Sequence, residues 1–363
     1  MTKAEIPIIS FEPFLKGDAT SRRVVATQIY QAFHDIGFLY LKDSGITQEQ
    51  VDNVFKLSRA FFDLPFEYKQ RYAVRDPTEN QGYSSDTKYL PKNQKKEATS
   101  KPKDHKEAYE HRRFDNPLCP PAGDLVRQNP DLVGFQKTLD TFYADCFQLC
   151  KEILRCLAIA LNIPGGENFF DAIIEDGDPQ LRLTHYPPVP ASLITPSKGS
   201  DTAGKDGRIL PHCDYGFCTL LFQDKVGGLE VDPFHTGEFI AATPKDGTVL
   251  INLGDLLHRL LNGRVKSTMH RVVSPETVVT DGNGEPMLPD RYSIPFFVHP
   301  IETAWIDPVL LSDGETRRFK GVNAGTWRSW RTSKIYGMEE QEQKFFDQLG
   351  IADELSLMAP IRA

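Results

Sequence analysis

Hydrophobic residues at steps of three and four predict helices at residues 21–33, 47–64 and 132–161, the last with the longest regular pattern. Thr47 and Gln50 give the second helix a capping-box start. A short apolar run at 38–41 predicts a strand between the first two helices. The first part of the chain is therefore expected to mix helices with strand.

Residues 76–130 are polar, rich in Lys, Asn and Pro, and show little periodicity. We expect a long connection there, with no more than one short strand. Seven lysines lie between Lys88 and Lys106, and we interpret this segment as a solvated loop rather than a basic binding surface. His105 and Glu107 lie in that loop, where no rigid geometry is expected.

After Pro179 the pattern changes to short β-prone runs separated by Gly, Pro and Asp. Such runs without long helices between them predict a sandwich or barrel rather than a doubly wound sheet. A helix-like piece at 255–263 interrupts the strands. Gly-rich segments at 197–208 and 280–289 are interpreted as solvent loops, with a role as lids as the alternative.

Composition limits the partners and the location. The 363 residues are 40% hydrophobic and 25% charged, with a formal net charge of -8. This acidic balance disfavours nucleic acid and anionic membranes as partners. No run approaches the ~20 apolar residues of a membrane span, and no secretory pattern is present, so we expect a cytoplasmic protein. The six cysteines form no CxxC pair and are expected to be free thiols.

His212 and Asp214 stand two positions apart at the start of an apolar, strand-like stretch. Side chains at i and i+2 of a strand share a face, so this pair would present an imidazole beside a carboxylate. A chain with nine histidines and 50 acidic residues has about one such pair by chance, and His105 with Glu107 is a second. Only the pair at 212 and 214 is expected on an element rigid enough to preorganise a metal site.

The pair needs a third ligand from another strand. Two histidines and one carboxylate on one face of an ion suit non-haem Fe(II) enzymes that activate oxygen. His270 is the candidate because it lies in a β-branched run, where an unpartnered imidazole would be costly to bury. The remaining histidines of the β-rich part are interpreted as surface or hydrogen-bonded core residues: His185, His235, His258 and His299.

Two further strands present polar side chains on one face. The alternation groups Arg291, Ser293 and Phe297 in RYSIPFF, and Arg182, Thr184 and Tyr186 in LRLTHY. A guanidinium and a hydroxyl that point into a barrel indicate a buried carboxylate ligand. A polar cavity is therefore favoured over a sheet face open to water.

These residues and the motifs around them resemble the isopenicillin N synthase-like family of Fe(II)- and 2-oxoglutarate-dependent oxygenases. The resemblance rests on LTHYPP, GGLEV, INLGDLLHRLLNGRVKSTMHRVV and RYSIPFF, and on IPIISF, VATQIYQAFHDIGFLYLKDSGI, LPFEYKQRY and DHKEAYEH nearer the start of the chain. It covers nearly the whole chain. LRLTHYPPV, HCDYGFCTLLFQDKVGGLEV and GVNAGTW are more similar to the thymine hydroxylase branch and its fungal-type relatives than to the plant flavonoid or gibberellin enzymes.

The resemblance implies a mixed α+β chain whose core is a double-stranded β-helix, or jelly roll, flanked by helices that include one long helix. The implied divisions are an N-terminal non-haem dioxygenase region at 1–130, a long supporting helix at 131–175, the oxygenase jelly-roll core at 176–305, and a C-terminal extension with a helix at 306–363.

The resemblance also implies roles for the site residues. His212, Asp214 and His270 would hold Fe(II), and Arg291 and Ser293, helped by Tyr186, would bind the distal carboxylate of 2-oxoglutarate. The reaction would consume O2 and 2-oxoglutarate, yield succinate, and oxidise a C–H bond of a small molecule, either a nucleobase or a specialised metabolite. Arg182, Tyr215 and Phe297 would line the substrate cavity, a set that suits a flat, polar ring. No separate acid or base is expected.

Departures from the family pattern, and other functions, bear on this interpretation. Thr184 replaces an Asn common in plant members, which weakens any co-substrate role at that position, whereas Cys213 should point away from the iron. The carboxylate of Asp214 disfavours halogenation. The alternatives are a family oxidase or cyclase that does not use 2-oxoglutarate, a non-catalytic barrel that binds it, and a demethylase of protein or nucleic acid. Intact metal ligands argue against the second, and the acidic balance argues against the third.

Overall fold

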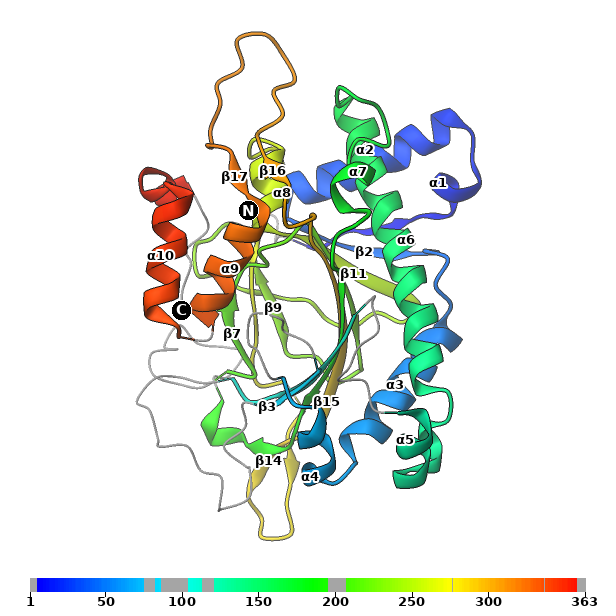
Figure 1. Ribbon diagram of the computed structural model, residues 1–363. Helices are drawn as coiled ribbons and strands as arrows, with labels where there is room; N and C mark the ends of the chain where they lie inside the picture. Colours follow the sequence, from blue (N-terminus) through cyan, green and yellow to red (C-terminus); the bar gives the residue numbers. More distant parts are fainter. Residues whose placement is uncertain are drawn as a thin grey trace.

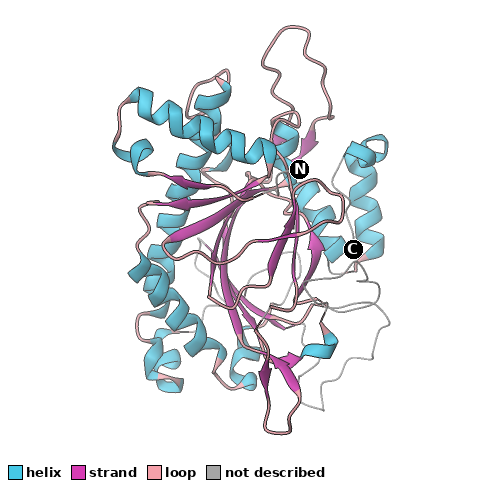
Figure 2. Cartoon of the chain, turned by 180° about the vertical axis from the view of Figure 1, so that it is seen from behind, coloured by secondary structure: helices cyan, strands magenta, loops and turns pink. Residues whose placement is uncertain are grey.

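Two β-sheets form the centre of the protein, and helices lie outside them (Figures 1 and 2). The structure is a computed structural model that describes residues 5–74, 82–85, 104–112, 121–194, 207–275, 277–335 and 337–357. The helices are α1 (Glu12–Lys16), α2 (Ala19–Asp35), α3 (Gln48–Phe62), α4 (Phe66–Lys69), α5 (Ala122–Gln128), α6 (Phe135–Leu161), α7 (Asp171–Ile174), α8 (Asp255–Leu260), α9 (Ala324–Ile335) and α10 (Glu339–Leu349).

The two sheets make the jelly roll that the sequence predicts. The large sheet has the order β1 (Ile8–Ser10), β2 (Phe38–Lys42), β11 (Thr248–Leu253), β8 (Cys218–Gln223), β15 (Arg291–Val298), β5 (Gln180–Tyr186), β4 (Glu107–Arg112) and β3 (Gly82–Ser85). The small sheet has the order β10 (Ile240–Ala241), β9 (Leu229–Asp232), β12 (Met269–Val272) and β7 (Ile209–His212). Short additions pair β13 (Val279–Thr280), β14 (Pro286–Leu288) and β6 (Val189–Pro190), and β16 (Trp305–Ile306) with β17 (Val322–Asn323).

Helix α6 packs against one face of the large sheet, which is therefore the outer face. Its Phe142 and Tyr143 lie with their ring centroids 5.1 Å from those of Phe222 and Phe296. Because side chains alternate along a strand, the residues between these positions point the other way, into the barrel. We call that the inner face of the large sheet. Part of the space behind it is filled by an apolar cluster of Ile6, Phe38, Tyr40, Leu229, Val231, Ala242, Leu250 and Val272.

The three expected helices are confirmed as α2, α3 and α6. Thr47 caps α3 in the predicted way, since its hydroxyl accepts from the Gln50 N–H while the Gln50 side chain accepts from the Thr47 N–H. The helix-like insert is α8. Each of these helices was predicted from residues within its own segment, by hydrophobic spacing or a capping pair, so the sequence alone was enough to locate it.

The expectation of a long connection at 76–130 is wrong, because β3, β4 and α5 lie in it. Glu107 is buried on β4, where it accepts hydrogen bonds from Lys69 (2.9 Å) and Tyr83 (2.5 Å) and pairs with Nδ1 of His185 (2.7 Å). His105 is buried as well. The strand was missed because its charges are compensated by residues far away in sequence. The lysines from Lys88 to Lys103 lie outside the described residues.

The described thiols agree with the expectation of free, buried cysteines. These are Cys146, Cys150, Cys156, Cys213 and Cys218, and Cys119 lies outside the described residues. Burial raises the pKa of Cys146 and Cys156 well above the ordinary value, which keeps both protonated and unreactive. Within the described segments, no helix combines the length and the apolar character that crossing a membrane requires.

Candidate active site

His212 and His270 face each other on neighbouring strands of the small sheet. His212 is the last residue of β7, and it pairs in register with His270 on β12. Asp214 lies two residues beyond the end of β7, in the turn towards β8, and not on a strand as expected. Gly254 packs against that turn so closely that a Cβ there would lie 2.5 Å from the Gly216 carbonyl oxygen. Glycine is therefore required at position 254 for the turn to hold its place.

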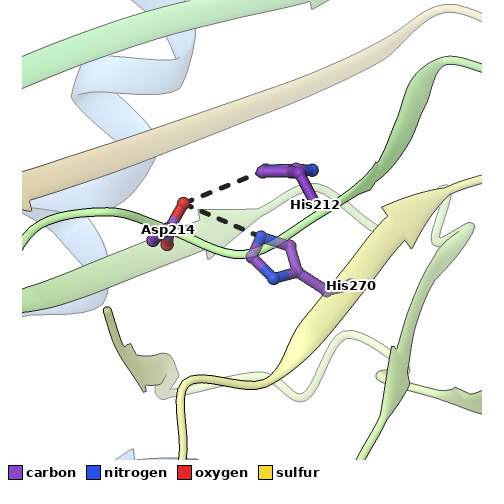
Figure 3. A group of neighbouring side chains, drawn as sticks. All are labelled: His212, Asp214 and His270. Atoms are coloured by element: carbon purple, nitrogen blue, oxygen red, sulfur yellow. Dashed lines mark ion pairs between the residues drawn. The ribbon is translucent and has the colours of Figure 1, made fainter. Parts of the chain in front are cut away.

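The three predicted metal ligands converge (Figure 3). One ligand atom from each of His212, Asp214 and His270 lies within 4.8 Å of the others. The Nε2 atom of each histidine is 3.9 Å from Oδ1 of Asp214. These separations suit three ligands on one face of a single ion, with the opposite face left for other molecules.

Hydrogen bonds fix which atoms remain free. Nδ1 of His212 donates to the carbonyl of Leu210 (2.9 Å), and Nδ1 of His270 donates to that of Thr268 (3.1 Å). A carbonyl only accepts, so Nδ1 carries the proton in both rings and Nε2 presents its lone pair. This is the arrangement that supports a metal-binding histidine.

Asp214 is held in the same way. Its Oδ2 accepts from the Thr219 hydroxyl and from the Asn252 side-chain amide, both at 2.7 Å, which leaves Oδ1 for a ligand. Burial alone would raise the pKa of this carboxyl, but His270, His212 and the two hydrogen bonds outweigh it and lower the pKa to about 2.

The electrostatics favour the protonation states that bind a metal. Burial and the neighbouring His270 lower the pKa of His212 to about 4, so this imidazole is neutral at pH 7 while Asp214 is ionised. Two neutral nitrogens and one carboxylate oxygen match the ligand set of non-haem Fe(II) sites that leave coordination positions open. The residues present therefore fit Fe(II).

The predicted co-substrate residues also come together, on β15 and β5. Arg291 stands opposite Tyr186, and its guanidinium lies 4.7 Å from the centroid of that ring. The Tyr186 hydroxyl is 3.4 Å from the Ser293 hydroxyl. Arg291 is fully buried and donates to the Gly227 carbonyl (2.8 Å) and to the Gln223 side chain (3.2 Å), while its Nη1 has no hydrogen-bond partner among the described residues. A buried cation with a free donor is suited to an anionic ligand.

Strand β8 connects the candidate metal ligands to the buried Arg291. Thr219 bonds to Asp214, and Gln223, four residues on, bonds to Arg291. Both side chains lie on the inner face, since the residue spacing is even. The two positions are about 13 Å apart along an extended strand. A dicarboxylate that reaches the metal at one end could thus meet Arg291 at the other.

The three predicted substrate residues lie around a stack of near-parallel rings. Tyr215 stacks on His299 with centroids 5.0 Å apart and an interplanar angle of 11°, and Phe297 is 6.5 Å from the same imidazole at 16°. The guanidinium of Arg182 lies 4.9 Å from the Phe297 ring centroid. Phe297 is also the register partner of Thr219, which places these rings beside the metal ligands.

Glu110 on β4 forms an ion pair with Arg182, its register partner on β5. Glu110 is almost fully buried, and within the segments that the structure describes its Oε2 atom has no hydrogen-bond partner. Burial raises the pKa of this carboxyl, and the attraction of Arg182 only partly offsets that effect. The pair therefore presents an acceptor and a donor side by side with little net charge.

Two family models match the chain. One is the non-haem dioxygenase in morphine synthesis N-terminal region, over residues 6–129, and the other is the 2OG-Fe(II) oxygenase superfamily, over residues 177–300. The 2-oxoglutarate-dependent dioxygenase ecdK of Aspergillus rugulosus is 31% identical over 345 residues, which cover 90% of this chain and 98% of that protein. The chain belongs to the Fe(II)- and 2-oxoglutarate-dependent oxygenases. The oxygenase is thus an enzyme that uses Fe(II), 2-oxoglutarate and O2.

Its relatives differ in what they act on. The structure of the Neurospora crassa thymine hydroxylase in complex with alpha-KG and thymine has a TM-score of 0.77 to this oxygenase, with 36% identity over 91% of this chain and 97% of that one. The proline hydroxylase buaE of Petromyces alliaceus is 28% identical over 92% of this chain and 100% of that protein. Membership of the family therefore leaves the substrate open, and none of these relatives favours an oxidase that works without 2-oxoglutarate or a non-catalytic barrel.

Sequence reasoning missed several residues of the oxygenase site. These are Glu110, Thr219, Gln223, Asn252 and His299. Thr219 and Asn252 are polar positions inside otherwise apolar strands, which was an available signal. His299 was interpreted as a surface or hydrogen-bonded core residue; it is buried, and its ring stacks on that of Tyr215. Of the other histidines, His185 bonds to Glu107 and Asp290, and His258 bonds to the Val265 carbonyl, as expected for hydrogen-bonded core residues.

Proposed function

We propose that the oxygenase binds its iron through Nε2 of His212, Nε2 of His270 and Oδ1 of Asp214, and that it oxidises a C–H bond of a small organic molecule. The convergence of these three atoms, with the second polar atom of each side chain already engaged, carries the proposal. Fe(II) bound there would activate O2 and couple the decarboxylation of 2-oxoglutarate to oxidation of the substrate. The protein's own task is to orient the partners.

Arg291, Ser293 and Tyr186 would bind the distal carboxylate of 2-oxoglutarate. The buried guanidinium supplies charge and a free N–H, and the two hydroxyls supply further donors. Because Gln223 and the Gly227 carbonyl hold the Arg291 guanidinium in place, little ordering is needed when the ligand arrives.

The substrate would be an uncharged, ring-shaped molecule with polar edges. Phe297, His299 and Tyr215 offer ring faces for stacking, and Arg182 with Glu110 offers a donor beside an acceptor. An anionic substrate would be repelled by the Glu110 carboxylate, which already neutralises Arg182. Thymine, present in the Neurospora crassa complex, is a molecule of this class.

The test is succinate formation by anaerobically purified, Fe(II)-loaded protein supplied with 2-oxoglutarate and O2. The substrate panel should pair each uncharged pyrimidine or aromatic ring with its carboxylate derivative. We expect substrate-stimulated succinate from uncharged members, and a loss of at least about a hundredfold in His270→Ala, since even supporting residues of a metal site are worth about 10- to 100-fold.

His34→Ala is the matched control, because His34 is exposed on α2, where its ring bonds to Asp35 and lies near the ring of Tyr30. This variant should retain wild-type activity and iron content. Oxygen uptake that is equally fast without 2-oxoglutarate would replace the proposal with the oxidase alternative. Wild-type iron binding in His270→Ala would refute the ligand assignment.

A further inference from the structure

A second arginine, Arg208, is buried beside the proposed co-substrate site. It immediately precedes β7, and its backbone N–H donates to the carbonyl of Val272 (2.9 Å) on the neighbouring strand. Its relative exposure is 0%. The segment 197–208 was interpreted from the sequence as a solvent loop, so a fully buried arginine at its end is unexpected.

Arg208 has only a neutral partner. One N–H group donates to the Pro289 carbonyl, and neither Nε nor Nη1 has a hydrogen-bond partner in the described part of the chain. Arg291 is in the same condition, with one carbonyl, one amide and an unpartnered Nη1. Among the residues that the structure describes, neither guanidinium has a carboxylate within ion-pairing distance. Two buried cations without counterions are costly unless a ligand supplies the negative charge.

The two carboxylates that act electrostatically on Arg208 form their hydrogen bonds with other groups. Asp224 and Asp290 both act on its pKa, but Asp224 accepts from the backbone N–H groups of Val226 and Tyr292, and Asp290 bonds to His185. Asp224 and Asp290 therefore reduce the positive potential around Arg208 but form no ion pair with it. The free N–H groups of Arg208 are therefore without a carboxylate partner among the described residues.

The two guanidiniums lie around the same tyrosine. Arg291 lies 4.7 Å from the centroid of the Tyr186 ring, and Arg208 lies 6.0 Å from it. Burial, and then the proximity of Arg291, lower the pKa of Arg208 to about 10, so it remains charged at neutral pH. A carboxylate placed next to Tyr186 and Arg291 would thus also be close to Arg208.

We propose that Arg208 is a second cationic binder of the distal carboxylate of 2-oxoglutarate and sets the site's selectivity for a dicarboxylate. The inference rests on the proposed role of Arg291 and adds a residue outside the Arg, Ser and Tyr set. Two guanidiniums allow each carboxylate oxygen to receive its own charged donor. A 2-oxo acid with an uncharged end would leave both cations buried and unpaired.

The test is the affinity of two ligands that differ only at the distal end. 2-Oxoglutarate and 2-oxopentanoate share the end that chelates the metal, but the second carries a methyl group in place of the distal carboxylate. Isothermal titration calorimetry on anaerobic, Mn(II)-loaded protein gives both dissociation constants without turnover. In Arg208→Met we expect 2-oxoglutarate to bind about 10- to 100-fold more weakly, the range of charged hydrogen bonds, while 2-oxopentanoate changes less than about twofold.

Arg259→Met is the matched control, because Arg259 is equally buried but pairs with Glu354 away from the site. It should lower the melting temperature and leave both affinities unchanged. Arg208→Lys keeps the charge with fewer donors, and should lose about 3- to 10-fold for 2-oxoglutarate alone. It serves as the decisive variant if melting curves show that Arg208→Met does not fold.

Equal weakening of both ligands would assign Arg208 a structural role through the Pro289 carbonyl and overturn the inference. No weakening of either ligand would also overturn it. A wild-type protein that binds both ligands with the same affinity would refute the proposed anion site itself, Arg291 included. The two failures are therefore distinguishable from one data set.

Discussion

Arg291 and Arg182 both project from the inner face of the large sheet, on adjacent strands, yet among the residues that the structure describes only Arg182 has a carboxylate partner. Around Arg182 each cation is paired: Arg182 with Glu110, Arg112 with Asp178 and Arg328 with Glu302. Around Arg291 the second cation, Arg208, likewise has no carboxylate partner in the described part of the chain. One barrel thus contains a region of compensated charge and a region of uncompensated charge.

The difference indicates which ligand each region is built to receive. An uncompensated, buried cation raises the energy of the empty protein and is relieved by an anion, which suits a co-substrate with a fixed carboxylate. A compensated pair has no need of a charged ligand and still offers hydrogen bonds, which suits an uncharged substrate. The proposed metal ligands lie between the two, linked to the first by β8 and to the second by the pairing of Thr219 with Phe297.

The largest effect should come from removing a cation in the uncompensated region. Arg291→Met should raise the KM for 2-oxoglutarate by about a hundredfold or more, since losing one partner of a buried charged hydrogen bond costs about 2–5 kcal/mol. The melting temperature of the ligand-free variant should not fall, because an unpaired buried charge has been removed. Steady-state succinate assays and thermal melts measure the two effects.

Arg182→Met is the counterpart in the compensated region. It should leave the KM for 2-oxoglutarate unchanged, weaken the substrate, and destabilise the protein because Glu110 is left buried without its cation. If both arginine variants affected 2-oxoglutarate equally, the division into two regions would be wrong.

A smaller effect is expected when the compensation itself is removed. Glu110→Gln keeps the shape and leaves Arg182 as an unpaired cation. We expect a loss of about 2 kcal/mol in the free energy of unfolding, below the ~3–5 kcal/mol of fully buried pairs because the Arg182 side chain keeps 22% of its exposure. Urea unfolding measures it. Affinity for a carboxylate derivative of the substrate should rise at the same time.

Glu152→Gln is the control for that variant, because Glu152 pairs with Arg155 on the partly exposed side of α6. Pairs of this kind contribute at most about 0.5 kcal/mol. A Glu110→Gln protein that is as stable as wild type and still rejects carboxylate ligands would show that the charge of Glu110 does not set the preference.

How much of this the sequence could predict depends on how local each signal is. The inner faces of β5 and β15 follow from alternation alone, so Arg182, Tyr186, Arg291 and Ser293 were predicted to lie together. The histidine and aspartate pair was found in the same way, although Asp214 reaches its place through a turn rather than a strand.

The residues that the sequence did not reveal act through contacts between distant segments. Glu110 is 72 positions from Arg182, and its strand has no apolar alternation, so it reads as a polar loop. Arg208 sits at the end of a Gly-rich segment, and nothing local shows that it is buried. In both cases the burial and the neighbours of the side chain come from segments that are distant in sequence and meet only in the folded protein.

The smallest expected effect is the contribution of His299 to the pH dependence of stability. Its size reports how completely the charges of the compensated region cancel. Burial, then Arg328 and Arg112, lower its pKa from 6.5 to about 3, so the folded state holds the neutral ring. The unfolded chain binds a proton below pH 6.5 and the folded protein does not, so stability should fall as the pH drops from about 6.5 towards 3. At pH ~5.5 this one group should cost about 1.4 kcal/mol relative to pH ~8.

His299→Gln has no imidazole at this position and should lose this pH dependence. Between pH ~8 and ~5.5 its free energy of unfolding should therefore fall by about 1.4 kcal/mol less than that of the wild type. Urea unfolding at the two pH values, with His34→Gln as the exposed control, measures the difference.

Arg328→Met in the wild-type background then separates the effect of burial on the His299 pKa from the effect of the neighbouring arginines. If it reduces the pH dependence, the paired arginines still act on His299, and compensation by Glu302 and Asp178 is incomplete. If the dependence is unchanged, burial alone keeps the ring neutral, and the contrast between the two regions is sharper than the ion pairs imply.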